Sequence, residues 1–165
     1  MIGIYLASYK ASHPNYNIKY QDINGLRDIG GDMLEINLEP YDFIIATPPC
    51  NYYSRGNYRR DKSEYSLKTK HLLPSILRKL CYQEKPFIVE NVRNYKKYKE
   101  LGLFNLPCFI YFIGRHTYRT NIMIMQDIEQ ELENIQHITQ KNREGGQNVH
   151  YVIEEWLKNI NNKEL

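Results

Sequence analysis

Short apolar runs recur along most of the chain, and polar or turn-forming residues follow each of them. The runs lie at residues 2–6, 18–20, 43–46 and 87–89. Runs of this length are too short for helices and are typical of strands buried on both faces of a parallel sheet. The spacing of the strands and the polar segments between them predicts an α/β fold, a doubly wound and mostly parallel Rossmann-like sheet.

Helical periodicity is confined to a few longer segments. Ser66 is positioned to cap a helix whose apolar face runs from Leu67 to Leu80 and is interrupted by Pro74. Residues 149–160 carry apolar side chains on one stripe, which predicts a terminal helix, and Gly145 to Asn148 precede it as a capping segment.

The segment between the predicted strand at 87–92 and the terminal helix is harder to assign. Residues 93–99 are basic and are expected to form a loop. The apolar stretches 103–112 and 121–125 are expected to form two strands of an edge hairpin around the basic turn 115–119. Residues 127–138 are acidic and helical in character.

Length and composition favour one ordinary soluble domain. The 165 residues predict a single domain, residues 1–165, with a substantial core. No apolar run approaches the roughly 18 residues that span a bilayer, and residues 1–6 lack the features of a secretory signal. We therefore expect no membrane association and a cytoplasmic location, in a bacterial or phage-infected cell. A homodimer or a partner subunit is compatible with the small domain and its many tyrosines.

The three cysteines, Cys50, Cys81 and Cys108, show neither a paired disulfide pattern nor the spacing of metal ligands. They are expected to be reduced thiols, and Cys81 and Cys108 stand in apolar surroundings typical of core residues.

Positive charge is concentrated in two short segments of the chain. The net charge is only +3, yet residues 55–62 hold four cations and one acid, and residues 93–99 hold four cations and no acid. Basic clusters and the 15 tyrosines together indicate a surface that can bind nucleic acid and stack on its bases. Aromatic filling of the core is the alternative explanation of the tyrosines.

A thiol and a carboxyl group are predicted to meet at one edge of the sheet. Pro48 and Pro49 end the strand at 43–46, because neither can donate to a sheet ladder, and they leave Cys50 in a rigid turn. Glu90 closes the strand at 87–92, and ligands bind outside the carboxyl ends of parallel strands. The basic residues Arg115 and Arg119 are expected to join them.

These segments resemble the motifs of DNA (cytosine-5)-methyltransferases. The stretch from Ala46 to Ser54 resembles their Pro-Cys motif, and residues 87–92 resemble their Glu-Asn-Val motif at a similar separation. The order of these motifs and the Arg-His-containing segment 115–119 is similar to that of small phage-encoded members without a target-recognition domain. The resemblance is strongest over residues 18–125, and it implies a class I methyltransferase fold with a reduced N-terminal part.

The resemblance implies a reaction. Carbon 5 of cytosine becomes nucleophilic enough to accept a methyl group once a thiolate has added to carbon 6. Cys50 would be that nucleophile, and Glu90 would share a proton with N3. Arg115 and Arg119 would orient the base and support Glu90, and the target base would be flipped out of DNA.

The implied cofactor is S-adenosylmethionine. Its binding residues would be Tyr5, Asp22, Asp32, Pro48 and Asn148. Contacts to the DNA would come from further polar and basic residues, namely Asn51, Ser54, Asn91, Arg55 and Arg59.

Other readings of these residues remain open. The family has a glycine-rich turn after its first strand, whereas residues 5–11 contain no glycine, so a catalytically inactive descendant that binds nucleic acid or a protein partner is the main alternative. A third reading takes residues 47–50 as a variant of the motif of amino-methyltransferases, which need no thiol. Asp22 and Asp32 can also be ordinary turn residues, Glu90 can cap a helix or form a salt bridge, and the two arginines can pair with later acids.

Overall fold

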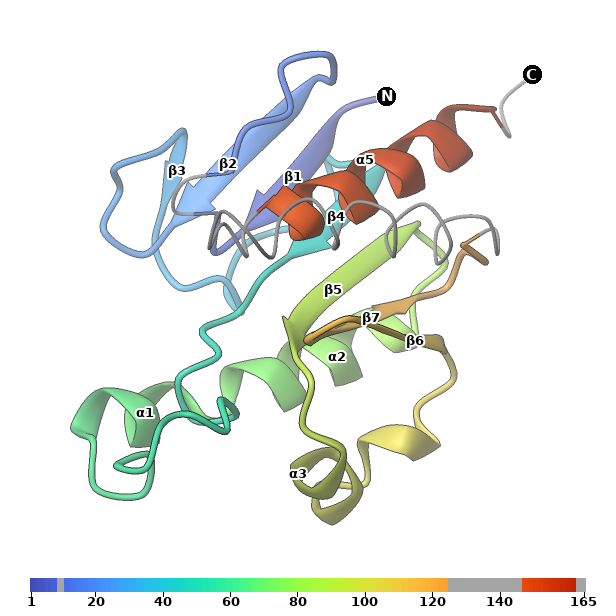
Figure 1. Ribbon diagram of the computed structural model, residues 1–165. Coiled ribbons are helices and arrows are strands. Elements are labelled where there is room, and N and C mark those ends of the chain that lie inside the picture. Colours follow the sequence, from blue (N-terminus) through green and yellow to red (C-terminus); the bar gives the residue numbers. More distant parts are fainter. Residues whose placement is uncertain (9–10, 125–146, 163–165) are drawn as a thin grey trace. The chain divides into compact units, whose positions relative to one another are not determined.

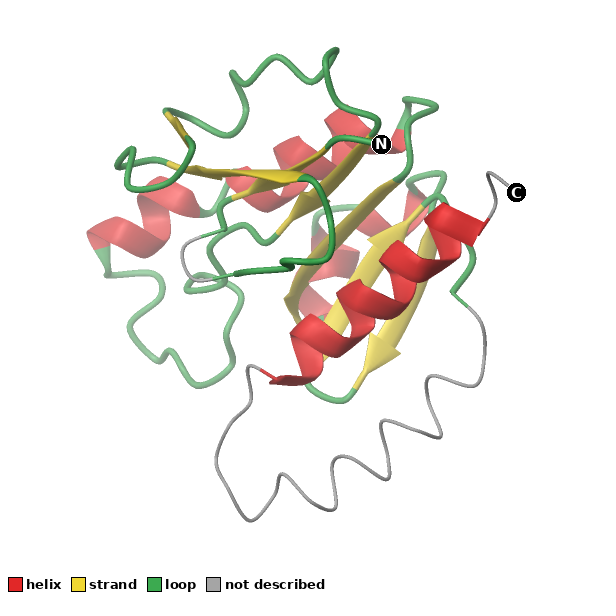
Figure 2. Ribbon diagram, turned by 90° about the horizontal axis from the view of Figure 1, so that it is seen from above, coloured by secondary structure: helices red, strands yellow, loops and turns green. Residues whose placement is uncertain are grey.

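Seven strands form one sheet in the order β3-β2-β1-β4-β5-β7-β6 (Figure 1). Their bounds are β1 Gly3–Leu6, β2 Ile18–Asp22, β3 Ile29–Gly30, β4 Phe43–Ala46, β5 Phe87–Val92, β6 Phe109–Ile113 and β7 His116–Thr120. The first five strands pair in parallel, whereas β7 is antiparallel to both β5 and β6. The strands twist relative to one another (Figure 2). The predicted α/β class and mostly parallel sheet are thus confirmed.

The computed structural model describes residues 1–8, 11–124 and 147–162. It divides into two compact units, Met1–Asn121 and Ile122–Leu165. The first unit contains the whole sheet, the helices α1 Glu64–Thr69, α2 Leu72–Cys81 and α3 Tyr95–Glu100, and a short 3₁₀ turn, η1 Leu103–Asn105.

The core of the first unit lies between one face of the sheet and α2. Side chains that alternate along β1, β4 and β5 pack with the apolar stripe of α2 in one cluster of buried residues. Among its members are Ile4, Leu6, Ile44, Ala46, Phe87, Val89, Leu73, Ile76, Leu77 and Leu80. The strands and the helix are therefore stabilised mainly by removing this apolar surface from water.

The helix expected from Ser66 onward is divided into α1 and α2. Ser66 does not cap it, because Ser66 is a buried residue inside α1 and the cap is Ser63, whose hydroxyl accepts from the Ser66 backbone N–H at 3.3 Å. Pro74 lies in the first turn of α2, where a missing N–H costs nothing, so it does not break that helix.

Two expectations for residues 93–125 are wrong. The basic segment forms the helix α3, because Asn94 caps it by accepting from the Lys97 N–H at 3.1 Å and Tyr98 is buried. The expected basic turn is itself the strand β7, and the hairpin turns at Gly114 and Arg115. Residues 121–124 follow β7 and are not a strand.

The second unit contains the helix α5 Gln147–Asn162, so the predicted terminal helix is confirmed. Its apolar stripe is buried at Val152, Ile153, Trp156, Leu157 and Ile160. Gln147 and Asn148, expected before the helix, lie within it. Residues 127–138, Gly145 and Gly146 lie outside the described residues.

Within the described parts of the chain, no helix has the length and the apolar character that crossing a membrane requires.

Candidate functional site

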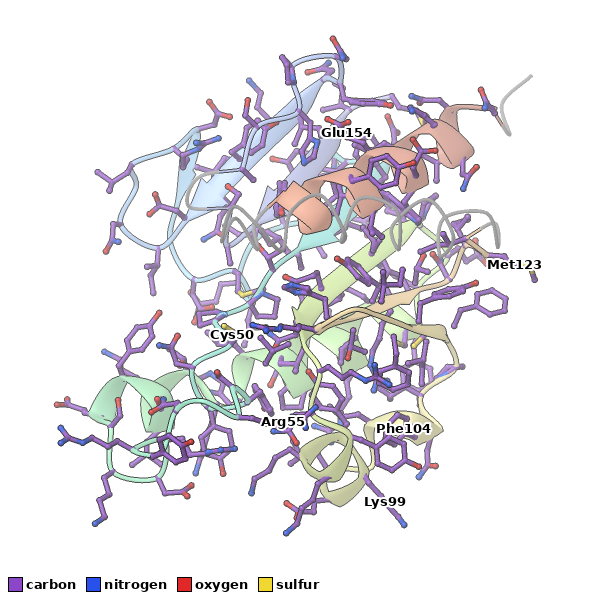
Figure 3. The ribbon with its side chains drawn as sticks, in the orientation of Figure 1. Cys50, Arg55, Lys99, Phe104, Met123 and Glu154 are labelled. Carbon is purple, nitrogen blue, oxygen red and sulfur yellow. The ribbon has the colours of Figure 1, made fainter. Side chains whose placement is uncertain are left out.

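The loop that carries Cys50 is fixed by hydrogen bonds at both of its ends. The Cys50 carbonyl accepts from the backbone N–H groups of Tyr53 at 2.9 Å and Ser54 at 2.8 Å. The Pro48 carbonyl accepts from Asn91 Nδ2 at 2.8 Å, and Asn91 is buried on β5. Strand β5 therefore holds the turn that follows its neighbour β4, where Figure 3 shows Cys50.

Glu90 is bound to a histidine from the neighbouring strand. Its Oε1 lies 2.6 Å from His116 Nδ1, and the two side chains are 13% and 21% exposed. Glu90 is directly opposite Tyr118 in the β5–β7 ladder, so His116 and Tyr118 share its face of the sheet.

Glu90 also acts on the thiol. Burial raises the pKa of Cys50, and the negative charge of Glu90 raises that pKa further. Burial likewise raises the pKa of Tyr118, and Glu90 adds to that effect. Cys50, Glu90, His116 and Tyr118 are called the Glu90 cluster below. Its thiol becomes easier to ionise when the Glu90 carboxyl group takes up a proton, because the opposing charge then disappears.

The two predicted arginines do not join this cluster. Arg119 pairs with Val89 in the ladder, so it lies on the face of the sheet opposite to Glu90. Its Nη1 donates to the Leu103 carbonyl at 2.5 Å, and its guanidinium lies over the rings of Tyr98 and Phe104. Arg115 is exposed in the turn between β6 and β7, where its carbonyl accepts from Arg93 N–H at 2.7 Å.

The acids expected to bind a cofactor are engaged in turns. Asp22 is buried, and its carboxylate accepts from the N–H groups of Asn24 at 2.5 Å and Leu26 at 3.2 Å. Asp32 is half-buried and accepts from the Leu34 N–H at 2.9 Å. Both therefore have the turn role that the sequence left open as the alternative.

Two of the remaining predicted cofactor residues are buried in the first unit, and one belongs to the second. Tyr5 is buried and stacks on His13 with ring centroids 5.9 Å apart. Pro48 is buried in the loop before Cys50. Asn148 lies in α5 of the second unit, and its side chain is outside the described residues.

Gln21 occupies the space between the carboxyl ends of β1 and β3. Its Oε1 accepts from the Ala7 N–H at 2.8 Å, and its Nε2 donates to the Gly31 carbonyl at 2.5 Å. Ser8 donates to the Gln21 carbonyl through both its N–H at 2.9 Å and its hydroxyl at 3.1 Å. Backbone N–H groups that would face a cofactor after β1 are thus already satisfied within the chain.

The turn after β1 has a backbone that usually requires glycine. Ala7 has a φ of 56°, in the left-handed region, and it is the one non-glycine residue with positive φ among the described residues. The glycine-free segment therefore still adopts a tight turn at this point.

Basic and aromatic side chains lie next to the Cys50 loop. Lys97 Nζ of α3 lies 5.7 Å from the ring centre of Tyr52, and Lys70 Nζ lies 6.0 Å from it. Asn94 Nδ2 donates to the Tyr53 carbonyl at 2.7 Å, which ties α3 to the loop. The basic surface is defined as nine cations of this loop, of α3 and of the residues that follow α1 and precede α3: Arg55, Arg59, Arg60, Lys62, Lys70, Arg93, Lys96, Lys97 and Lys99.

The residues expected to bind the substrate divide into two groups. Asn51, Arg55 and Arg59 are exposed and Ser54 is half-buried, all on the loop after β4, and Figure 3 shows Arg55 there and Lys99 on α3. Asn91 is buried and already bonded to Pro48, so it positions the loop.

The sequence interpretation missed His116, Tyr118 and Asn94. His116 and Tyr118 could have been found from strand alternation, because they are two residues apart and share a face in any strand that includes both. Asn94 stands directly before a charged segment, and an asparagine at such a position is typical of a helix N-cap.

Comparison with known proteins adds no relative. No protein-family model matches the chain, and no curated protein matches it.

Proposed function

We propose that this protein is a DNA (cytosine-5)-methyltransferase that forms a covalent bond between Cys50 and carbon 6 of a cytosine. The observation that carries the proposal is the position of Cys50, which follows β4 in a loop held by the hydrogen bond from Asn91 of β5 to Pro48, next to Glu90 on that strand. The mixed α/β sheet is consistent with a Rossmann-like methyltransferase fold, and the adjacent basic surface is suited to the DNA backbone.

The first half of the reaction follows from the Glu90 cluster. The Cys50 sulfur adds to carbon 6, and the electron pair of the 5,6 double bond moves toward carbon 5 and N3. A protonated Glu90 gives its proton to N3, so the charge on the base is neutralised. Glu90 must carry this proton before the sulfur adds. A protonated Glu90 has no negative charge to oppose formation of the Cys50 thiolate, so the thiolate forms more easily at this step.

His116 would position Glu90 in this step. Its ring nitrogen lies 2.6 Å from Glu90 Oε1, which orients the carboxyl group and provides a route by which a proton can return to it. Tyr118, on the same face, is held neutral because burial raises its pKa. These residues replace the arginine that the sequence interpretation placed beside Glu90.

The methyl donor of the proposal is S-adenosylmethionine, which supplies an electrophilic methyl group when bound. The residues around β1 and β2 do not fit it in the present conformation. The Gln21 side chain is bonded to Ala7 and Gly31, Ser8 donates to the Gln21 carbonyl, and Asp22 is buried with both oxygens bonded. Binding would require Gln21 to release Ala7 and Gly31.

Two measurements test the covalent step. With a duplex that contains 5-fluorocytosine and with S-adenosylmethionine present, a stable protein–DNA adduct is expected, because fluorine cannot be removed from carbon 5 after methylation. Without the donor, exchange of the carbon 5 hydrogen of cytosine with deuterated water reports addition alone.

The variants for this test differ by single thiols. Cys50→Ala is expected to abolish both the adduct and the exchange, whereas Cys108→Ser keeps both and serves as the matched control. Methylation that persists in Cys50→Ala would contradict the proposal and favour amino-methyltransferase chemistry, which needs no thiol.

A second candidate function is favoured by the contacts of Gln21. If these contacts persist, the chain is a methyltransferase-like protein that binds nucleic acid or a protein partner without methylating. Calorimetry separates the two: heat on titration with S-adenosylmethionine supports the enzyme, whereas DNA binding with no such heat and no deuterium exchange supports the second candidate.

A further inference from the structure

A buried guanidinium lies on the other face of the sheet from the Glu90 cluster. Arg119 is only 2% exposed, and among the described residues its Nη2 has no hydrogen-bond partner. The neighbours that act on its pKa are Cys108, Tyr98 and Cys81, and no carboxylate is among them in the described part of the chain. A buried cation without an acid needs another anion nearby.

Two thiols are placed to supply that anion. Cys81 is the last residue of α2, and Cys108 comes directly before β6. Cys81 is a member of the main core cluster, and Cys108 packs against it half-buried. The Cys108 sulfur interacts with both the Cys81 thiol and the Arg119 guanidinium.

The two thiols differ in how easily they ionise. The interaction with Cys81 and the positive charge of Arg119 lower the pKa of Cys108, although burial opposes them. The interaction with Cys108 and burial raise the pKa of Cys81. Cys108 is therefore the nucleophile of the pair, and Cys81 remains a thiol.

We propose that Cys108, next to Arg119 and Cys81, is a site of oxidation by hydrogen peroxide at which a disulfide to Cys81 forms. This inference does not depend on the proposed methyltransferase function, because none of these residues belongs to the Glu90 cluster.

The chemistry requires peroxide as the only oxidant. The Cys108 thiolate attacks one oxygen of the peroxide, the O–O bond breaks, and hydroxide leaves and takes up a proton, which gives a sulfenic acid. The Cys81 sulfur then attacks the Cys108 sulfur, the S–O bond breaks, and water leaves with the Cys81 proton. In total, two thiols lose two electrons and two protons, and one peroxide becomes two waters.

The test uses the full chain in its reduced form, treated with hydrogen peroxide at pH 7. Peptide mapping without reductant is expected to show a Cys81–Cys108 disulfide, while Cys50 stays reduced because its own pKa is raised. In the Cys81→Ser variant, dimedone is expected to label Cys108 as the trapped sulfenic acid.

A pH series adds an independent readout. Alkylation of Cys108 by iodoacetamide is expected to have its midpoint at a lower pH than alkylation of Cys50 and to be the faster of the two at pH 7, because the pKa of Cys108 is lowered and that of Cys50 is raised. The titratable groups that face Cys108 and can move this midpoint are Cys81, Arg119 and, through Arg119, Tyr98.

Several results would overturn the inference. Oxidation of Cys50 before Cys108, a wild-type protein in which no Cys81–Cys108 disulfide forms, or a Cys81→Ser variant without dimedone label on Cys108 would each do so. Because the decisive mapping is done on the wild-type chain, the inference remains testable even if Cys81→Ser prevents folding.

Discussion

At the scale of single residues, Glu90 determines the behaviour of the candidate nucleophile. The carboxyl group is mostly buried, bonded to His116, and close enough to Cys50 for its charge to raise the pKa of the thiol. A resting thiol whose ionisation is opposed by burial and by a neighbouring negative charge is less reactive toward alkylating agents and oxidants. The coupling can be measured without knowing the substrate.

Replacing Glu90 by glutamine is expected to accelerate the alkylation of Cys50 severalfold at a fixed pH near 8. The substitution removes the negative charge that raises the pKa of Cys50 but keeps the shape of the side chain, so the thiolate fraction increases. The rate is measured by mass spectrometry of iodoacetamide-treated protein.

The matched control for this prediction is Glu39→Gln, which removes the same charge from a side chain that is 89% exposed. This variant is expected to leave the rate at Cys50 unchanged. An unchanged or slower rate in Glu90→Gln would show that its charge does not reach the thiol.

Ala7 has a left-handed backbone that its side chain makes costly. Because glycine adopts a φ of 56° without this cost, Ala7→Gly is expected to raise the free energy of unfolding by about 0.5–1 kcal/mol. Urea denaturation monitors the change. Ala11→Gly is the control: the described positive φ values do not include Ala11, so the same substitution should lower stability there.

At the scale of elements, α3 and the Cys50 loop form one connected structure through Asn94. The Asn94 side chain caps α3 with its oxygen and donates to the Tyr53 carbonyl with its nitrogen, and the residue is buried. The position of the loop beside Cys50 therefore depends on a helix that follows β5 in the chain.

Asn94→Ala is expected to lower the free energy of unfolding by about 2 kcal/mol, since it removes both a helix cap and a buried hydrogen bond. Asn94→Asp keeps the cap oxygen but cannot donate to Tyr53, so it should recover only about half of the loss. Thermal and urea denaturation measure both variants. The control is Asn105→Ala, at an exposed position. If Asn94→Ala and Asn94→Asp had equal stabilities, the two atoms of the Asn94 side chain would not have the separate roles proposed here.

The elements that the sequence predicts well are the ones whose stability comes from apolar burial. Strands β1, β4 and β5 are continuous apolar runs, and their adjacent carboxyl ends led directly to the pairing of Cys50 with Glu90. The apolar stripe of α5 was equally clear from the sequence. In each of these cases the local pattern and the tertiary environment agree.

The elements that were missed are polar, and tertiary contacts create them. Thr117, Tyr118 and Arg119 were expected in a basic turn, yet all three are buried because β7 pairs with strands on both sides. Helix α3 has one buried aromatic residue, Tyr98, whose hydroxyl donates to the Val92 carbonyl. The pairing of β7 with β5 joins segments that are far apart in the sequence, and a periodicity argument does not examine such pairs.

At the scale of the whole molecule, the distribution of charge matters more than its total. The chain has a net charge of only +3, but the basic surface contains nine cations from one loop, from α3 and from the residues that follow α1 and precede α3. Exposed tyrosines stand among them, with Tyr58 95% and Tyr95 60% exposed. Such a surface combines phosphate contacts with rings on which bases can stack.

Binding to duplex DNA is expected to weaken steeply with salt, with a slope of about −4 to −6 in log K against log salt concentration if roughly five or six phosphates are contacted. The double variant Arg55→Ala and Lys99→Ala should reduce the magnitude of this slope by about 2. Fluorescence anisotropy provides the affinities.

The comparison for the DNA prediction is Lys19→Ala, which removes an exposed cation of β2 that is not part of the basic surface. This variant is expected to keep the wild-type slope. Equal slopes in all three proteins would place the DNA-binding residues elsewhere.

The Glu90 cluster and the Cys108 site both depend on the two-residue turn at Gly114 and Arg115. Gly114 has a φ of 56°, as a tight hairpin with glycine first requires, and this turn fixes which residues of β7 stand opposite β6. A slip of one residue would exchange the faces, placing a guanidinium next to Glu90 and leaving Cys108 without its cation. An insertion at this short hairpin would thus disable two chemically unrelated sites at once, although it touches neither.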